Sequence, residues 1–330
     1  MGIKHLNRYL QTNCKTGISK IPLNDLRGKK IAIDTSIYLY RFQGENALLE
    51  NFYLMISIFR EYNITPLFIF DGKPPKEKYN LIKKRKTDKK QAEIKYNELN
   101  NELENKLQEE HKTDNIELYE TIEIKTLKTN MNRLKKEFIK IQQSDIENVK
   151  CLFQAYGVTY IEALGEADKL CAKLVCKNRV FACLSEDMDL FVYGCNRVFR
   201  YLSLLNKTVI LYDLKQILTD INLTLDEFKC ICIASGTDYN NDTDIDTNLF
   251  QTLKYFKKYK KSNENNFYEW LEDNTNYVEN IYELYNIINL FNLSDMPEYK
   301  NFDKIKIMNG PINKIQLTKI MAFENFIFID

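Results

Sequence analysis

The chain has 330 residues, which is long enough to bury a substantial core in one large domain or two smaller ones. Its 47 Lys and Arg residues nearly balance its 46 Asp and Glu residues, so a globally basic nucleic-acid-binding protein is excluded, whereas a locally basic one is not. The two His residues, His5 and His111, lie far apart, which argues against histidine-based zinc or triad chemistry.

The cysteines and the N-terminus indicate an intracellular protein. Eight Cys occur at irregular spacing without a Cys-x-x-Cys motif, as expected of reduced thiols in the nucleus or cytoplasm. Residues 1–6 lack the apolar segment of a signal peptide, and no apolar run is long enough to span a bilayer. We therefore expect a soluble monomer that is not secreted and has no membrane partner.

Two short apolar runs near the N-terminus are predicted to be buried strands. Residues 30–34 and 66–71 form these runs, each ends in an Asp, and helical patterns occupy residues 36–42 and 47–62 between them. Strands that alternate with helices indicate an α/β fold with a mostly parallel central sheet flanked by helices. Because sites in such sheets form at the carboxyl ends of the strands, both terminal acids lie where chemistry is expected.

The segment over residues 73–143 has an unusual charge pattern. It begins and ends with basic residues, its middle is acidic, and its apolar residues are sparse. Composition alone is equally compatible with a solvated helical hairpin and with a disordered insert. In the functional interpretation it forms two long helices whose basic ends flank a carboxylate site and meet phosphates. Lys78 and Arg85 are two helical turns apart and would share one helix face.

Acids recur in the next part of the chain. A helix over residues 145–156 and a strand over 158–162 precede the motif Gly-Glu-Ala-Asp, residues 165–168, which opens another helix. Acids in a first helical turn are mildly stabilising, and for this motif that explanation alone would suffice.

A strand predicted over residues 179–189 ends in the motif Ser-Glu-Asp-Met-Asp. Residues two apart in an extended chain point the same way, so Asp187 and Asp189 would present two carboxylates on one side. Burying two like charges that close is unfavourable unless a cation lies between them. A solvated acidic loop is the alternative. Against it, four other sites also place acids where an apolar run stops or a helix begins.

The remaining elements are, in order, a β pair over residues 198–202 and 208–212, a helix over 225–234 and a turn over 235–239 that carries Asp238. A polar loop over residues 241–244 follows, and then a helix over 250–261 with a strongly basic face. The rest of the chain is expected to be helical.

Six motifs, taken in order, resemble those of flap endonucleases and of the wider superfamily of XPG-type structure-specific 5′ nucleases. They are Met-Gly-Ile at the N-terminus, Ile-Ala-Ile-Asp-Thr-Ser, Phe-Asp-Gly-Lys-Pro-Pro, Gly-Glu-Ala-Asp, Ser-Glu-Asp-Met-Asp and Gly-Thr-Asp-Tyr. The match covers residues 1 to about 240, and the ordered set is far more specific than any single motif.

The resemblance implies a PIN-like 5′ nuclease core over residues 1–240, with an arch over 73–143 that a single-stranded 5′ end passes through or beneath. A helical C-terminal region would follow over residues 241–330. The resemblance also implies two Mg²⁺ ions, with Mn²⁺ as a substitute. It makes seven carboxylates the metal ligands: Asp34, Asp71, Glu166, Asp168, Asp187, Asp189 and Asp238. The family usually has Glu where Asp168 stands, so this ligand has a shorter arm but keeps its charge.

Other residues would bind the substrate. Lys78 and Arg85 match the two basic residues at the foot of the family's arch, which contact the scissile phosphate. Tyr40 matches an aromatic residue that stacks on a base near the cut, and Gly2 would lie near the site, as the family's N-terminal residues do.

The chain departs from the family in two places. Where relatives have a Gly-rich hairpin that holds duplex DNA and a monovalent cation, residues 240–246 contain no Gly, which predicts a degenerate hairpin. The C-terminal residues 326–330 contain no sliding-clamp motif of the Gln-x-x-Leu-x-x-Phe-Phe type, so recruitment by that route is not expected. The remaining predicted phosphate contacts are Lys83 and Lys84 on the arch, and Lys254, Lys257 and Lys258, which would substitute for the hairpin.

The expected function is hydrolysis of phosphodiester bonds in DNA with a 5′ single-stranded branch or end, in replication, repair or recombination. An oxygen-only site suits Mg²⁺, and a two-metal mechanism with water as the nucleophile would leave a 5′-phosphate. Binding through phosphates predicts strong salt dependence and weak sequence dependence. Two alternatives are a 5′-to-3′ exonuclease acting on DNA ends or RNA, and a non-catalytic scaffold for DNA junctions. An aspartyl-nucleophile phosphatase is discarded because Ser36 stands where that chemistry needs its second Asp.

Overall fold

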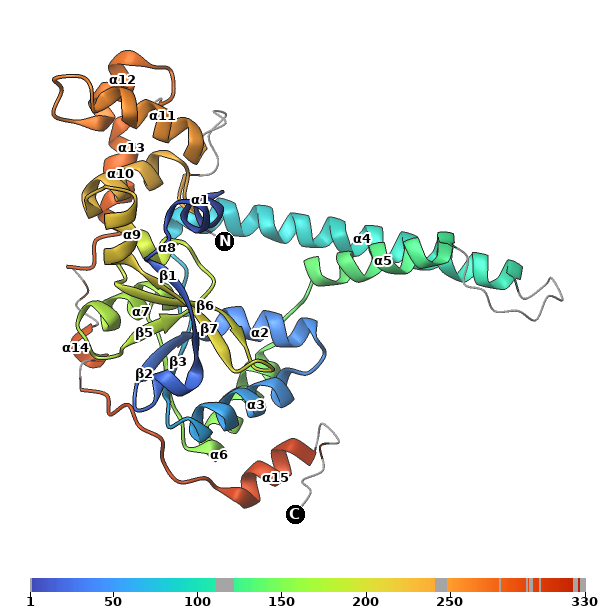
Figure 1. The fold of residues 1–330 in the computed structure, drawn as a ribbon. Coiled ribbons are helices and arrows are strands. Elements are labelled where there is room, and N and C mark those ends of the chain that lie inside the picture. Colours follow the sequence, from blue (N-terminus) through green and yellow to red (C-terminus); the bar gives the residue numbers. More distant parts are fainter. Residues whose placement is uncertain are drawn as a thin grey trace.

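A seven-stranded sheet forms the centre of the molecule, with strand order β1-β7-β6-β5-β2-β3-β4 (Figure 1). This computed structural model describes residues 2–110, 122–240, 248–278, 280–294, 296, 299–302, 304–322 and 326. The strands are β1 Ile18–Pro22, β2 Lys30–Asp34, β3 Thr65–Phe70, β4 Thr159–Glu162, β5 Ala182–Leu184, β6 Arg197–Ser203 and β7 Thr208–Asp213. From β6 to β4 every neighbouring pair is parallel, whereas β7 pairs antiparallel with both β1 and β6. The predicted mostly parallel sheet is confirmed.

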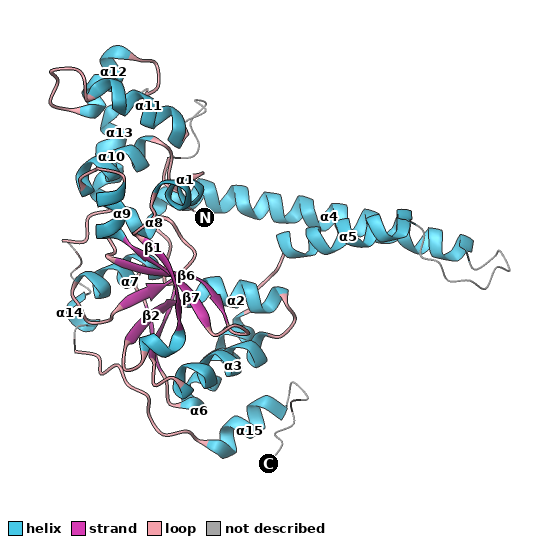
Figure 2. Cartoon of the chain, viewed as in Figure 1, coloured by secondary structure: helices cyan, strands magenta, loops and turns pink. Residues whose placement is uncertain are grey.

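Helices cover both faces of this sheet (Figure 2). The core on one face includes residues of α2, α3, α6 and α15, and the core on the other includes residues of α1, α7, α8 and α10–α13. Successive strand residues point to opposite faces, so β2 gives Ile31 and Ile33 to the first core and Ala32 to the second. Burial on both faces explains why the central strands are almost continuously apolar in sequence.

The helices that cover the sheet or extend from it have the following bounds: α1 Leu6–Asn13, α2 Thr35–Gly44, α3 Leu48–Glu61, α4 Tyr79–Glu110, α5 Ile122–Glu137, α6 Gln143–Tyr156, α7 Ala167–Cys176, α8 Asp189–Val192, α9 Leu214–Asp220, α10 Leu225–Ala234, α11 Leu249–Tyr259, α12 Phe267–Asn274, α13 Ile281–Leu290, α14 Tyr299–Phe302 and α15 Lys314–Ala322. The described helices include none that is both long enough and apolar enough to cross a membrane.

Helices α4 and α5 form the arch and project from the sheet side by side (Figure 1). The apolar residues of this segment are few, but α5 spaces four of them three or four residues apart, so that they share one buried face: Ile124, Leu127, Met131 and Leu134. This buried face lies on a helix that packs against α4. Composition allowed either a helical hairpin or a disordered insert for this segment. Its described residues form the two paired helices of a hairpin.

The strand predicted over residues 179–189 is wrong in its length, because β5 ends at Leu184. Side-chain hydrogen bonds turn the chain immediately afterwards. The Asp187 N–H donates to Ser185 Oγ (3.1 Å), and the Asp189 N–H donates to Asp187 Oδ1 (2.9 Å). Asp189 then begins α8. The two acids therefore belong to a turn and a helix start rather than to one extended segment.

Several further elements differ from the sequence-based expectation. Helices α1 and α9 and strand β1 were not predicted. The C-terminal part is not helical throughout, because an extended segment precedes α15 and forms an antiparallel bridge between Asn309 and Val158. Leu317 and Met321 of α15 then join the core that α3 and α6 line. The predicted loop over residues 241–244 and most of the degenerate hairpin lie outside the described residues. The division into domains at residue 240 stays a prediction.

Gly72, which directly follows the Asp at the end of β3, allows two loops to approach closely. Its N–H donates to the Gly165 carbonyl (2.7 Å). A Cβ at this position would overlap the Ala163 carbonyl oxygen and lie 2.8 Å from the Leu164 carbonyl group. The close approach therefore depends on the absence of a side chain.

We predict that Gly72→Ala lowers the free energy of unfolding by about 1–3 kcal/mol, the usual effect of overpacking, because backbone must move to admit the methyl group. Urea unfolding followed by circular dichroism measures the change. Gly165→Ala is the matched control, because the nearest atom to a Cβ there is 4.0 Å away. Equal stability of the two variants would contradict the prediction.

Candidate active site

Acidic residues from separate segments meet at the carboxyl edge of the parallel strands. Asp34 is the last residue of β2, and Asp71 directly follows β3. The Asp34 carboxylate accepts hydrogen bonds from the Ser36 N–H (3.2 Å) and from Ser185 Oγ, next after β5 (3.0 Å). Asp71 accepts from Ser36 Oγ (2.5 Å) and from the Ala167 N–H at the start of α7 (2.8 Å). The fold thus joins four chain segments around two carboxylates.

Two further acids of this region have carboxylate oxygens without hydrogen-bond partners. Both carboxylate oxygens of Asp189 are buried and unpaired, and so is Asp168 Oδ1 in the first turn of α7. Buried unpaired carboxylate oxygens are costly, because they lose water without gaining a donor. Their arrangement suits a cation better than any group that the described residues provide.

The pKa values of these acids reflect their crowding. Burial, followed by the charge of Asp71, raises the pKa of Asp34 to about 7. Burial also raises the pKa of Asp168, with Asp34 the next cause, and that of Asp189, with Asp187 the next cause. Since each neighbouring carboxylate raises the pKa of the next, these acids form one electrostatic cluster.

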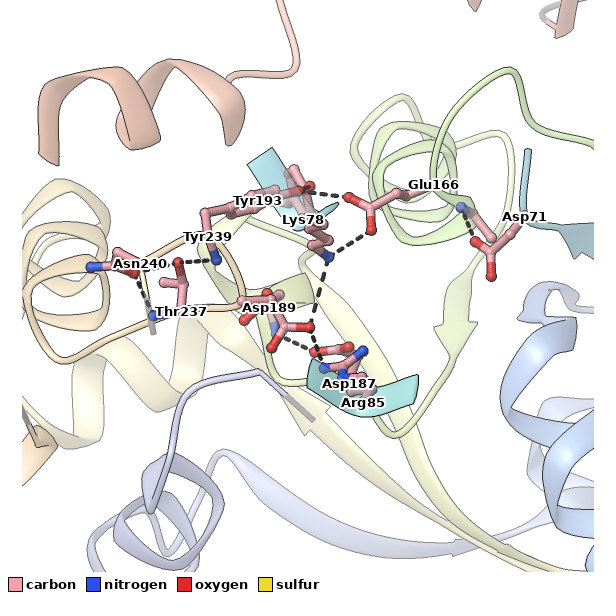
Figure 3. A network of polar contacts seen from close by, with 12 residues as sticks. Asp71, Lys78, Arg85, Glu166, Asp187, Asp189, Tyr193, Thr237, Tyr239 and Asn240 are labelled. Carbon is pink, nitrogen blue, oxygen red and sulfur yellow. Dashed lines mark hydrogen bonds and ion pairs between the residues drawn. The ribbon is translucent and has the colours of Figure 1, made fainter. Parts of the chain in front are cut away.

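A second group of acids in the same site is paired with the base of the arch (Figure 3). Lys78 Nζ lies 2.6 Å from Glu166 Oε1 and 3.8 Å from Asp238 Oδ2. Arg85 Nη2 lies 2.8 Å from the same Asp238 oxygen. Burial is the largest single influence and lowers the pKa of Lys78, but Glu166, Asp189 and Asp238 together outweigh it, so the pKa is raised and the side chain stays an ammonium. The two cations thus neutralise two of the acids.

Sequence analysis missed the hydroxyl and amide groups that hold the acids in place. The Tyr239 hydroxyl donates to Glu166 Oε2 (2.7 Å) and lies 3.0 Å from the Tyr193 hydroxyl. Asn240 Oδ1 accepts from the Thr237 N–H and hydroxyl, both at 2.7 Å, and so closes the turn that carries Asp238 (Figure 3). Thr237 and Tyr239, like Ser36 and Ser185 above, stand beside acids in the motifs, which was their one sequence signal, whereas Tyr193 and Asn240 lie outside the motifs.

The structure places the predicted substrate-binding residues at different distances from the acids. A Cβ on Gly2, whose φ is +73°, would lie 2.6 Å from Oδ1 of both Asp187 and Asp189, so Gly2 borders the cluster. Tyr40 is exposed on α2, with Lys89 Nζ 4.5 Å from the centre of its ring.

The other predicted phosphate contacts do not pair with the acids. They are Lys83 and Lys84 on α4, and Lys254, Lys257 and Lys258 on α11, all of them exposed. Within the described part of the chain, none of them forms an ion pair with a carboxylate. Their charges are therefore available to an anionic ligand.

The donor set fits divalent metal ions, although the described residues do not already form a chelating group of three His, Cys, Asp or Glu side chains. All the donors are carboxylate oxygens, which Mg²⁺ prefers. The orphaned oxygens of Asp189 and Asp168 are those that an ion would satisfy. Lys78 and Arg85 are already paired with Glu166 and Asp238, which explains how the site balances part of its charge without an ion.

Solved structures show the fold of this chain. The catalytic core of Rad2 in complex with DNA substrate has a TM-score of 0.67 at 18% identity, covering 98% of this chain and 95% of that one. Flap endonuclease-1 from Methanococcus jannaschii has a TM-score of 0.62 at 22% identity, covering 98% of this chain and 93% of that one. The sheet, its covering helices and the arch therefore have the fold of these two proteins.

The sequence shows the family. Residues 1–92 match the model of the XPG N-terminal domain and residues 157–238 match that of the XPG I-region, together more than half of the chain. A probable RAD2-like endonuclease of Invertebrate iridescent virus 6 is 28% identical over 73% of this chain. Flap endonuclease 1 of Salmo salar is 32% identical over 72% of it. The matched parts span 68% and 62% of those two proteins. The chain belongs to the XPG-type flap endonuclease family, which confirms the resemblance drawn from its motifs.

We predict that Asp189→Asn stabilises the protein in EDTA while it removes stabilisation by divalent ions. An uncharged amide lessens the repulsion from Asp187, so the free energy of unfolding should rise by roughly 1–3 kcal/mol, the scale of a buried unsatisfied group. Thermal unfolding in EDTA and in MnCl₂ measures both effects.

Asp213→Asn is the matched control for this substitution. Asp213 caps α9 by accepting from the Gln216 N–H (3.2 Å), and Asn caps helices as well as Asp does. This control should unfold like wild type in both solutions. A lower stability of Asp189→Asn in EDTA would contradict the crowding of charges at this site.

Proposed function

We propose that this chain is a structure-specific 5′ nuclease that hydrolyses phosphodiester bonds of branched DNA, with 5′ flaps as the principal substrate. The observation that carries the proposal is the acid cluster, where two basic residues from the foot of the arch, Lys78 and Arg85, pair with Glu166 and Asp238. Its relatives are named flap endonuclease and RAD2-like endonuclease, in agreement with this activity. A location in the nucleus or cytoplasm and a monomeric state belong to the same proposal.

We propose that the seven predicted carboxylates hold two Mg²⁺ ions, with Mn²⁺ as a substitute, and that these ions would neutralise the phosphodiester and make water a better nucleophile. Asp34 and Asp71 are held by donors from Ser36, Ser185 and α7, so their oxygens are oriented before any ion binds. Tyr239 orients Glu166 in the same way, because burial, with Tyr193 and Glu166, raises the pKa of its hydroxyl and keeps it a donor.

The basic residues at the foot of the arch would act on the phosphate itself. If Glu166 and Asp238 held cations, Lys78 and Arg85 would be free to contact the scissile phosphate and to offset the charge that develops in the transition state. No protein nucleophile is required, and a 5′-phosphate would be left on the product. Tyr40 presents an exposed ring to an unpaired base.

The test of this function is cleavage of a panel of labelled substrates in Mg²⁺ or EDTA: a 5′ flap, a nicked duplex, a blunt duplex, a single strand and RNA. We predict that the flap is cut fastest, only in Mg²⁺, and that Asp187→Asn lowers kcat by about 100-fold or more. Asp213→Asn is the control with wild-type activity. Preferred cutting of uncapped RNA or DNA ends would favour the exonuclease alternative, and binding without cutting would favour the junction scaffold.

The lysines of α11 should contribute to DNA binding through charge alone. We predict that replacing Lys254, Lys257 and Lys258 together by Gln weakens DNA binding and reduces the slope of log K against log salt by about 0.9 for each lost phosphate contact. Fluorescence anisotropy in Ca²⁺ at several salt concentrations measures the slope. Lys260→Gln is the control, because Lys260, the residue directly after this helix, is paired with Glu227 (2.7 Å). Equal slopes for the triple variant and wild type would show that this helix does not contact phosphates.

A further inference from the structure

Glu186 directly precedes Asp187 in the Ser-Glu-Asp-Met-Asp motif, yet its carboxylate is bound by β6. Glu186 Oε1 accepts the Tyr201 N–H (2.6 Å). Glu186 Oε2 lies 3.3 Å from Arg200 Nε, an ion pair without the alignment of a hydrogen bond. The acid that sits next to Asp187 in sequence is thus engaged by protein groups, whereas Asp189 has no donor for either side-chain oxygen among the described residues.

Arg200 joins the turn that carries these acids to the N-terminal helix. The side chain is 7% exposed, and its Nη2 donates to the Glu186 carbonyl (3.0 Å). Its Nη1 donates to Asn7 Oδ1 on α1, and Tyr212 donates its hydroxyl to the same oxygen (2.9 Å). A planar guanidinium can hold several acceptors in fixed directions, which an ammonium cannot.

An irregularity in β6 makes this arrangement possible. The pairing of β6 with β7 shifts register between Arg200 and Ser203, and Tyr201 within the shift has φ 54°, in the left-handed region. Bulges of this kind redirect groups at the edge of a site. Here the shift directs the Tyr201 N–H to Glu186, which accounts for a strained backbone at a residue that is not Gly.

We propose that Glu186, Arg200, Tyr201 and Asn7 form a positioning clamp that holds the turn after β5 so that Asp187 and Asp189 face the proposed metal ions. The clamp also reaches the other side of the cluster, because Asn7 lies on α1, five residues after Gly2, which borders both acids. Arg200 and Glu186 are positioning residues: neither is a proposed ligand of the metal ions or of DNA. This inference rests on the proposed function of the acid cluster.

The test compares Arg200→Met and Glu186→Gln with wild type in three measurements. Loss of the free Mn²⁺ signal in electron paramagnetic resonance gives the affinity for Mn²⁺ without any turnover. We expect each variant to bind Mn²⁺ about 10- to 100-fold more weakly, the usual effect of removing a group that orients metal ligands. Flap cleavage should recover as Mn²⁺ is raised. DNA affinity in EDTA should stay within about twofold of wild type, because the clamp touches none of the basic residues proposed to bind DNA.

Arg197→Met is the matched control on the same strand. Arg197 donates to the Phe181 carbonyl (2.7 Å) and stacks on the Phe181 ring, away from Glu186, so its loss should leave the Mn²⁺ affinity unchanged. In the double variant Arg200→Met/Glu186→Gln, the loss of affinity should match the larger single loss rather than the product of the two, because both residues act through one clamp.

The outcomes separate the clamp from the proposed function. Wild-type protein that neither binds Mn²⁺ nor cuts a flap would overturn the function itself. Wild-type protein that does both, together with folded variants that bind Mn²⁺ equally well or lose affinity independently of each other, would overturn the clamp. If Arg200→Met fails to fold by circular dichroism, Glu186→Gln alone decides, because it retains the size and shape of the side chain.

Discussion

Repulsion among buried carboxylates at one edge of a sheet is the constraint on which the rest of this structure depends. Parallel strands bring Asp34 and Asp71 together because their carboxyl ends meet at that edge, and neighbouring turns add further acids. Such a cluster lowers the stability of the protein without bound ions, and it is retained where the charges serve a function. The raised pKa values and the unpaired oxygens of Asp168 and Asp189 are two consequences of the same crowding.

The foot of the arch partly neutralises the negative charge of these carboxylates. Lys78 lies in the short turn before α4, and Arg85 lies two helical turns further on, in α4. The start of the arch therefore places two cations beside the acids. The foot of the arch is held in place, because Lys89 donates to the Ile139 carbonyl (3.2 Å) on the segment that returns to the core. Without metal ions, the ion pairs of Lys78 and Arg85 neutralise part of the site's charge. These ion pairs can be replaced when metal ions bind the acids and a phosphate binds the two cations.

The sequence predicted the elements with strong local patterns and failed where tertiary contacts decide. The apolar runs of β2 and β3 were identified because burial on both faces makes them continuous. The turn after Leu184 was missed, because the hydrogen bonds of Ser185 and Asp187 that end the strand depend on where those side chains point. The acids were recognisable as a set only through ordered motifs. The proposed role of Glu186 could not be recognised in the sequence. Its partner Arg200 lies on β6, and the contact depends on a register shift in that strand, which residue spacing does not reveal.

The central claim is that acids scattered through the sequence are drawn together to hold divalent ions beside a basic helical foot. Diffraction from crystals grown in manganese, recorded where manganese scatters anomalously, tests it most directly. The account predicts anomalous peaks among these carboxylates, with the oxygens of Asp168 and Asp189 turned toward them. Asp34, Asp71 and Asp189 turned away from one another, with no anomalous peak between them, would contradict it.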